Sequence, residues 1–410
     1  MQSTGLSDED GRDPSGAAGR VEPGAAARGV EGLTVLQLVP SLESGGVERG
    51  CVDIARALTA AGATALVASA GGRMESALAR AGGRLLKMDV RAKAPWRIRA
   101  NARALASVIR AERVDVVHAR SRAPAWAGWL ASQDTGVAFV TTWHGTYSEN
   151  LPFKRLWNSV MARGRPTIAV SDFIAGEIAR RHPEAQVVTI PRGVDLAAFD
   201  EAAVSAERTA GLAERWGLIE SPRPVVMLPG RLTRWKGQEP FIEAAARLKA
   251  IRGAEDFVFL MVGGDLDSDF ARGLERRIRA RGLGNVAALA GHCDDMAAAL
   301  KLAAVVVSAS LEPEAFGRVA AEAAAMGRPV VASDHGGARE TVEEGRNGFR
   351  YPPADPQALA EAVQRALQLD DSQRAHMAAA GRARVVQRFS LARMEAETLA
   401  VYARAAGRED

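Results

Sequence analysis

Two carboxylates eight residues apart, Glu314 and Glu322, flank the start of a predicted helix in the second half of the chain. The β-branched run at residues 305–307 is typical of a buried parallel strand, and the helix begins after Phe316 and ends at Gly327. A helix N-terminus attracts phosphate through its unpaired N–H groups and partial positive charge. A carboxylate on those N–H groups would repel phosphate, so Glu314 is better placed beside an uncharged part of the same ligand. The pair suggests a sugar nucleotide; the alternative is an ordinary βαβ unit with two solvated glutamates.

A second group of charged residues follows another predicted strand of this half. The loop from Gly230 to Gly237 contains Arg231 and Lys236 and comes just after a strand that ends at Leu228. An arginine can bind a phosphate as a two-pronged fork, and a lysine can approach it as a point charge. These two cations could therefore face a diphosphate from the side opposite the helix. The alternative is a solvated basic loop.

The Asp-x-Asp sequence formed by Asp265 and Asp267 could hold Mg²⁺. It lies in a glycine-rich loop before a predicted helix, where aspartate also serves as the N-cap, and we favour the capping interpretation. If two cations and a helix N-terminus already neutralise a diphosphate, no metal is required. We therefore expect no metal cofactor, and activity in the presence of EDTA.

The first half of the chain has two candidate sites at strand ends. Gly45 and Gly46 precede a helical pattern, and two glycines there allow the backbone to approach a phosphate closely. A tight strand-to-helix turn is the competing interpretation. His144 ends another strand beside Gly145, where an imidazole can reach a ligand hydroxyl. A single histidine is more often structural, unless other residues converge on the same cleft.

Strands and helices alternate through two stretches of the chain. Residues 31–200 form the first and residues 201–388 the second, with a charged connecting segment at 196–222. This alternation predicts an α/β protein with two doubly wound parallel sheets. Ligands of such sheets sit beyond the carboxyl ends of the strands. Residues 1–30 are rich in Gly, Ala, Asp and Arg without hydrophobic periodicity, which predicts a disordered tail.

Composition and charge indicate a soluble globular protein with an uneven charge distribution. The chain has 410 residues, of which 47% are hydrophobic and 25% charged. No apolar run reaches the ~20 residues of a membrane span, and the N-terminus lacks the apolar core of a signal peptide, so we expect a cytoplasmic protein. Residues 31–200 hold 22 Lys and Arg against 15 Asp and Glu. This excess predicts an anionic partner, either a phosphorylated acceptor or a lipid surface; the alternative is the arginine usage of a GC-rich genome.

Taken in order, the strand-end residues resemble those of retaining glycosyltransferases of family 4. The residues that carry the resemblance are Gly45-Gly46-Val47-Glu48, His144-Gly145, Ile190-Pro191-Arg192-Gly193-Val194-Asp195, Gly230-Arg231 with Lys236-Gly237, and Glu314 with Glu322. The resemblance covers residues 33–388. It implies a GT-B fold, with two Rossmann-like domains, an interdomain cleft, a first domain for the acceptor and a second for the nucleotide-sugar donor. It also implies that a helix within residues 389–410 crosses back to the first domain.

The resemblance implies roles for residues of the second domain. Glu314 would contact the donor sugar, and Glu322 would bind the ribose. The backbone that follows Phe316, through Gly317 and Arg318, would hold the diphosphate. Arg318 departs from the family pattern, which commonly has an apolar residue there. It would add a phosphate contact or merely a surface charge.

The remaining roles implied by the resemblance concern charge balance and closure. Arg231 and Lys236 would balance the phosphate charge as the leaving group departs. Gly45 and Gly46 would close over the diphosphate from the first domain, and His144 would orient the donor sugar. Members of the family retain the anomeric configuration without an obvious nucleophile. The usual proposal is a front-face mechanism, in which the leaving phosphate oxygen takes the acceptor proton.

Three segments resemble, more particularly, the lipopolysaccharide-core glycosyltransferases of α-proteobacteria: residues 117–126, 141–147 and 158–164. This likeness implies transfer of a hexose to a lipid-linked saccharide acceptor. The donor would be GDP-mannose, which we favour, or UDP-glucose. A non-catalytic nucleotide-sugar-binding protein is the alternative outside enzymes. An epimerase or oxidoreductase would need a dinucleotide fingerprint after the first strand, and that segment lacks one.

Residues 91–111 form a basic segment with six Lys and Arg and no acidic residue. Apolar side chains are interleaved with these cations, namely Trp96, Ile98, Leu105, Val108 and Ile109. Such a face could rest on anionic headgroups; alternatively, the apolar residues pack on the sheet. We expect the first domain, which contains this segment, to contact the inner membrane peripherally, and we expect no nucleic-acid partner.

Overall fold

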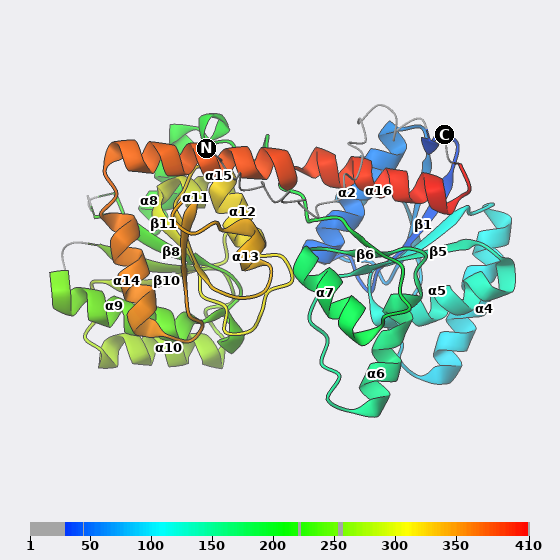
Figure 1. Ribbon diagram of the computed structural model, residues 1–410, viewed down its shortest axis with the longest axis horizontal. Helices are drawn as coiled ribbons and strands as arrows, with labels where there is room; N and C mark the ends of the chain where they lie inside the picture. Colours follow the sequence, from blue (N-terminus) through cyan, green and yellow to red (C-terminus); the bar gives the residue numbers. More distant parts are fainter. Residues whose placement is uncertain (1–28, 44, 220–222, 253–256, 409–410) are drawn as a thin grey trace, which may run out of the picture.

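The computed structural model describes residues 29–43, 45–219, 223–252 and 257–408 (Figure 1). The tail predicted over residues 1–30 lies outside these residues up to residue 28. Val30 is fully buried in the core of the first domain, and its carbonyl accepts a 3.0 Å hydrogen bond from the Leu33 amide. The packed part of the chain therefore begins no later than Val30.

The first domain is built on a seven-stranded sheet in which all neighbouring strands are parallel, in the order β3-β2-β1-β4-β5-β6-β7. Its strands are β1 (Thr34–Leu38), β2 (Thr64–Ser69), β3 (Arg84–Lys87), β4 (Val116–Ala119), β5 (Ala138–Trp143), β6 (Thr167–Ala169) and β7 (Val187–Thr189). Its helices are α2 (Gly46–Ala60), α3 (Glu75–Arg80), α4 (Pro95–Ala111), α5 (Arg122–Thr135), α6 (Pro152–Ser159), η1 (Val160–Arg163) and α7 (Asp172–Arg181).

The second domain has a six-stranded parallel sheet in the order β10-β9-β8-β11-β12-β13. Its strands are β8 (Val225–Pro229), β9 (Val258–Val262), β10 (Ala287–Gly291), β11 (Ala303–Ser308), β12 (Val330–Ser333) and β13 (Gly348–Tyr351). Its helices are η2 (Glu201–Ala203), α8 (Ala206–Arg215), η3 (Arg234–Lys236), α9 (Gln238–Arg252), α10 (Asp269–Ala280), α11 (Met296–Leu302), α12 (Arg318–Ala325), α13 (Ala338–Thr341), α14 (Pro356–Leu367) and α15 (Asp371–Arg388).

Both sheets are covered by helices on their two faces, which explains the continuous apolar runs of their central strands. Successive side chains of a strand point to opposite faces. Accordingly, Val35 and Leu36 of β1 belong to different hydrophobic clusters, as do Val305 and Val306 of β11. This architecture confirms the predicted fold class of two doubly wound parallel-sheet domains.

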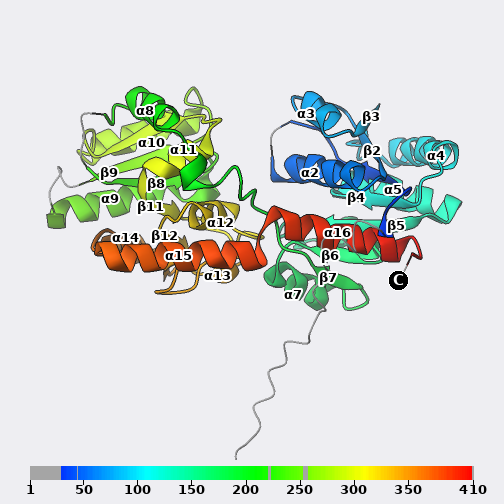
Figure 2. The same ribbon diagram turned by 90° about the horizontal axis from the view of Figure 1, so that it is seen from above.

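The chain crosses between the domains twice, and the two crossings lie together. The Val194 amide donates to the Phe389 carbonyl at 2.8 Å, and the Leu391 amide donates to the Val194 carbonyl at 2.9 Å. Beyond this point α16 (Leu391–Ala405) packs on the first domain, with Met394 and Tyr402 in the same hydrophobic cluster as residues of β1 and α2. Figures 1 and 2 show α15 on the second domain and α16 on the first.

The basic segment at residues 91–111 contains the whole of α4, and most of its apolar residues belong to the core of the protein. Ile98, Leu105 and Ile109 are 7%, 0% and 4% exposed and belong to the hydrophobic cluster on one face of the first sheet. They cannot also face a membrane, so the expectation that they form a lipid-binding face is wrong. Trp96 differs from them, because 72% of its surface is exposed.

Candidate active site

Lys236 and Glu314 form an ion pair beyond the carboxyl ends of β8 and β11, two strands that pair in the second sheet. The Lys236 Nζ lies 2.7 Å from the Glu314 Oε1, and only 14% and 13% of the two side chains are exposed. Ser310 Oγ donates to the same carboxylate oxygen, and Ser308 Oγ does so at 3.4 Å. The pair is therefore a fixed, partly buried charge pair at the edge where doubly wound sheets bind ligands.

The loop that carries Lys236 ends at Gly237, a glycine that no larger residue could replace. Gly237 has φ +79°, and a Cβ added there would lie 1.9 Å from the Ala309 carbonyl oxygen. That close approach lets the Leu311 amide donate to the Trp235 carbonyl at 2.7 Å. The loop after β8 is thereby joined to the loop after β11, and Lys236 is directed at Glu314.

Glu314 is ionised at neutral pH. Burial by itself would raise the pKa of Glu314, but the Lys236 charge and the hydrogen bonds from Lys236, Ser310 and Ser308 outweigh it and hold the pKa below its usual 4.5. An ionised carboxylate only accepts hydrogen bonds. Its Oε1 already has three donors, whereas Oε2 has no hydrogen-bond partner within the described residues. Oε2 is therefore the atom that can accept hydrogen bonds from ligand hydroxyls.

Arg231 supplies a second cation in the loop that carries Lys236. The aliphatic part of Lys236 lies against Gly230, where an added Cβ would be 3.6 Å from the Lys236 Cδ. The Arg231 carbonyl accepts a 2.9 Å hydrogen bond from the Gln238 Nε2, which fixes the backbone. The Arg231 side chain is exposed, and within the described residues no side chain pairs with its guanidinium. It is thus available for an anion.

The helix that follows Glu314 begins with an uncapped N-terminus. Gly317 precedes α12 with φ +86°, a left-handed conformation that favours glycine, and no side chain of the described residues caps the helix. The Phe316 ring is 4% exposed and packs edge-to-face on Phe389 with centroids 5.3 Å apart. Phe316 can therefore contact a ligand only through its backbone, whereas the first N–H groups of α12 remain free to bind an anion.

Glu322 lies on α12 beside Arg318, with 15% of its side chain exposed. The Arg318 Nε lies 3.3 Å from the Glu322 Oε1. Burial raises the pKa of Glu322 above its usual 4.5, and the charges of Arg318 and Arg49 oppose that rise. Arg49 belongs to α2 of the first domain, so a charge from across the cleft acts on this carboxylate.

Gly46 marks the place where the first residues of α2 and α12 come together. The Arg192 Nη2 donates to the Gly46 carbonyl, and a Cβ on Gly46 would lie 3.3 Å from the Arg318 Nη1. Arg318 is the first residue of α12, and α2 begins at Gly46, with Gly45 as its N-cap. Two helix N-termini and two guanidiniums thus meet at the domain junction. All four favour an anion there.

His144 lies next to this junction on the side of the first domain. Burial and the nearby charges of Arg192 and Arg120 hold the pKa of His144 well below its usual 6.5, so the imidazole is neutral at pH 7. Its Nε2 is buried and has no hydrogen-bond partner within the described residues. A neutral imidazole with an unused buried nitrogen suits a hydrogen bond to a sugar hydroxyl.

Arg120 and Arg192 were not predicted to have a role in the site, although each follows a strand. Arg120 is 3% exposed and donates through Nε to the Gln37 Oε1 at 2.9 Å, and its Nη2 has no hydrogen-bond partner within the described residues. Burial, together with the Arg120 and Arg318 charges, lowers the pKa of Arg192 to about 9, which leaves it charged at neutral pH. Their positions after β4 and β7 were the signal that could have identified them.

The structure brings the predicted site residues together in two groups. Lys236 and Glu314 form one group in the second domain. The other contains Gly46, Arg318 and Glu322. His144 adjoins this group, because Arg192 binds the Gly46 carbonyl and its charge also acts on His144. Within the described residues no hydrogen bond or ion pair joins the two groups.

Asp265 and Asp267 do not cap the following helix, contrary to the favoured interpretation. Ser268 is the N-cap of α10, and its side chain accepts from the Ala271 amide. Asp265 instead accepts a 2.9 Å hydrogen bond from the Asp267 amide within the turn. Ser268 occupies the N-cap position in place of either aspartate because it immediately precedes the first residue of the helix. Among the described residues no three His, Cys, Asp or Glu side chains gather as metal ligands would.

Comparison with known proteins identifies the family of this chain. Residues 44–198 match the family described as "Glycosyltransferase Family 4", and residues 214–384 match "Glycosyl transferases group 1". The chain is 31% identical over 348 residues to a D-inositol 3-phosphate glycosyltransferase of Xylanimonas cellulosilytica, across 74% of this chain and 76% of that protein. The chain belongs to the GT-B glycosyltransferases of group 1 and family 4, and it is an enzyme.

Solved structures agree with this assignment. A glycosyltransferase from Rickettsia africae superposes with a TM-score of 0.84 and 34% identity, covering 92% of this chain and all of that one. HepE of Anabaena, solved in complex with UDP-glucose, superposes with a TM-score of 0.76 and 25% identity, covering 90% of this chain and 98% of that one.

Proposed function

We propose that this enzyme transfers a hexose, with retention of the anomeric configuration, from a nucleoside-diphosphate hexose to a lipopolysaccharide-core or related glycan acceptor. The Lys236–Glu314 pair carries the proposal, because it presents a cation for phosphate and a carboxylate for hydroxyls within one hydrogen bond of each other. The core-glycan acceptor is supported by the segment likenesses at residues 117–126, 141–147 and 158–164.

In this proposal the second domain holds the donor. Lys236 and Arg231 bind the diphosphate from one side, and the free N–H groups at the start of α12 bind it from the other. Glu314 accepts hydrogen bonds from sugar hydroxyls through Oε2. Glu322 accepts hydrogen bonds from the ribose. As the bond between the anomeric carbon and the phosphate oxygen breaks, charge grows on the phosphate, where these cations stabilise it.

The first domain completes the site in the proposed mechanism. Gly46 brings the start of α2 against the diphosphate, and Arg192 fixes the Gly46 carbonyl. The neutral His144 orients the donor sugar. The acceptor hydroxyl attacks from the face that the phosphate leaves, and the leaving phosphate oxygen takes its proton. The products are the extended glycan and the nucleoside diphosphate.

The donor we propose is GDP-mannose, with UDP-glucose as the second candidate. The core transferases that the chain resembles include mannosyl- and glucosyltransferases alike, so the resemblance does not choose between the sugars. A similar GDP-mannose-dependent mannosyltransferase of Mycolicibacterium smegmatis supports mannose, and the presence of UDP-glucose in the HepE structure supports glucose. The two sugars differ at one hydroxyl, so one or two hydrogen bonds in the pocket separate them.

A thermal-shift panel of GDP-mannose, UDP-glucose and ADP-glucose, run in EDTA, tests donor and metal independence together. We expect one donor to raise the Tm more than the others, since a ligand that binds only the native state stabilises it. The same donor should then be consumed in EDTA once a core oligosaccharide is added. Stabilisation without any turnover would favour a non-catalytic binding protein. A strict need for Mg²⁺ would make Asp265 and Asp267 candidate ligands.

We also propose that the enzyme is cytoplasmic and contacts the inner membrane peripherally through the first domain. Within the described residues no helix is long and apolar enough to cross a bilayer. Trp96 and Leu156 are 72% and 64% exposed, and Arg155 lies beside Leu156. Binding to phosphatidylglycerol vesicles should therefore fall when Trp96 and Leu156 are both replaced by serine. Equal sedimentation with neutral and anionic vesicles at low salt would contradict this proposal.

A further inference from the structure

A cavity of about 870 Å³ opens in the first domain beyond the carboxyl ends of β1, β4 and β5. The sheet changes winding direction between β1 and β4, and such switch points are where doubly wound folds bind ligands. The residues that line it are Pro40, Arg91, Lys93, Ser121, Arg122, Ala123, Thr146, Tyr147, Ser148, Phe153, Lys154 and Trp157. His144 precedes this lining by two residues, so the cavity adjoins the proposed active site.

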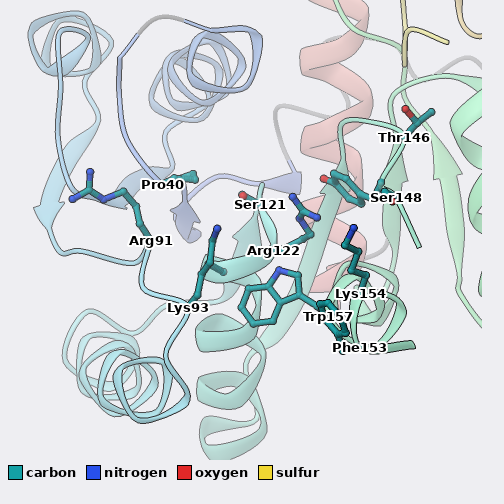
Figure 3. Close-up of a pocket in the computed structure, with 12 residues that line it drawn as sticks. Pro40, Arg91, Lys93, Ser121, Arg122, Thr146, Ser148, Phe153, Lys154 and Trp157 are labelled. Carbon is teal, nitrogen blue, oxygen red and sulfur yellow. The ribbon is translucent and has the colours of Figure 1, made fainter. Parts of the chain in front are cut away.

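Among the described residues that line this cavity there are four cations and no carboxylate. Figure 3 shows Arg91 and Lys93 on one side, Lys154 on the other, and Arg122 between them. Arg91 already pairs with Asp89, its Nε lying 2.9 Å from the carboxylate. The other three have no carboxylate partner within the described residues. The cavity therefore holds an excess of positive charge that only an anionic ligand would neutralise.

The structure holds Arg122 in place for such a ligand. Its Nη1 donates to the Asn158 Oδ1 at 3.0 Å, and its Cζ lies 4.5 Å from the centroid of the Tyr147 ring. Arg122 is also the first residue of α5, and the Ser121 hydroxyl at the N-cap makes no capping hydrogen bond. A fixed guanidinium beside an uncapped helix start offers several donors to one anion.

Aromatic side chains supply the apolar part of the same cavity. Trp157 and Phe153 line it together with Tyr147, and Trp157 is braced by Trp126, whose Nε1 donates to the Trp157 carbonyl at 3.1 Å. Aromatic faces suit the apolar C–H faces of a sugar ring, and the cations suit a charged substituent on it. An amphipathic ligand of this kind fits the cavity better than a neutral sugar does.

We propose that this cavity is the acceptor site and that it selects a saccharide bearing an anionic group, a phosphate or a carboxylate. Lys93, Arg122 and Lys154 bind the anionic group, and Trp157 packs on the sugar ring. This inference rests on the proposed function, since it names the acceptor of the same reaction.

The test is saturation-transfer NMR with mannose 6-phosphate, galacturonic acid and mannose as probes at low salt. A saturating nucleoside diphosphate is present, so that it occupies the donor cleft and the phosphate of mannose 6-phosphate cannot bind there. We expect at least one charged probe to bind about 10-fold or more tightly than mannose, and the phosphate and carboxylate arms to show which anion is preferred. The Lys93→Ala/Lys154→Ala variant should weaken that probe about 10-fold or more, because it removes two charge-assisted contacts.

The matched control is Lys87→Ala/Arg103→Ala, which removes two cations of the same domain that do not line the cavity; it should bind like the wild type. Equal binding of mannose and both charged probes, or no effect of the Lys93 and Lys154 changes, would overturn the proposal. So would vesicle binding that depends on these lysines while no charged sugar binds. If the probes bind as expected but no nucleotide sugar does, the proposed function fails and the anionic site stands.

Discussion

Replacing Lys236 by alanine is expected to lower kcat about 10²-fold or more, the effect of losing one preorganised charge at a developing anion. Lys236 is held by its 2.7 Å contact with Glu314 and by the glycine-locked loop before α9. It therefore reaches the diphosphate without reorganisation. The charge on that phosphate grows as the sugar departs, so kcat should fall more than donor affinity does. Steady-state transfer rates and donor Kd values measure the two effects.

Two variants separate chemistry from folding in this experiment. Lys236→Ala leaves Glu314 partly buried without its counter-charge, which is destabilising, whereas Lys236→Ala/Glu314→Gln removes both charges. We expect the double variant to regain Tm but not turnover. Lys249→Ala is the control, since Lys249 donates to the Gly282 carbonyl in the same domain. Transfer near the wild-type rate in a folded Lys236→Ala enzyme would show that Lys236 has no part in catalysis.

Replacing Glu314 by alanine is expected to lower kcat by a similar factor, about 10²-fold or more, for a different reason. Glu314 faces the sugar in our proposal, so the variant should bind the free nucleoside diphosphate almost normally. It should lose most of the additional affinity for the nucleotide sugar. Thermal shifts with the diphosphate and with the matching nucleotide sugar measure the two separately. A parallel loss for both ligands would place Glu314 on the phosphate instead.

The pH dependence of stability should differ in sign between Glu314 and Glu322. The pKa of Glu314 is lowered on folding, so its ionised form stabilises the native state above pH 4.5, and this stability is lost as pH falls below that value. The pKa of Glu322 is raised on folding, so its ionisation costs stability as pH rises above 4.5. At pH 7 we therefore expect Glu314→Gln to lower the Tm and Glu322→Gln to raise it.

The opposite signs reflect different surroundings on neighbouring elements. Glu314 has a lysine and two serine hydroxyls directed at one oxygen. Glu322 has a single arginine at 3.3 Å and is otherwise buried. In our proposal Glu322 gains hydrogen-bond donors from the ribose hydroxyls only when the donor binds. The free enzyme is therefore less stable with this buried carboxylate ionised, as is common for preformed binding sites.

Much of the second domain could be predicted from local sequence. The β-branched run of β11, the start of α12 and the charged loop after β8 are each a short stretch of consecutive residues, so periodicity and turn residues identify them. β13 (Gly348–Tyr351) was missed. It is a short strand at the edge of the sheet with an arginine in it, and its pairing with β12 stabilises it more than any local preference does.

The fold class and the strand ends that carry charged residues could be predicted from the sequence, because both follow from local alternation of apolar and polar residues. Which of those residues meet depends on the packing of the whole chain. Lys236 and Glu314 are 78 positions apart, and Arg192 and Gly46 are 146 apart. Their contacts depend on strand order and on the junction between domains. The same long-range packing turned the apolar residues of α4 inward and left the cationic cavity of Lys93, Arg122 and Lys154 open. No local pattern contains that information, since burial is set by the neighbours that the fold supplies.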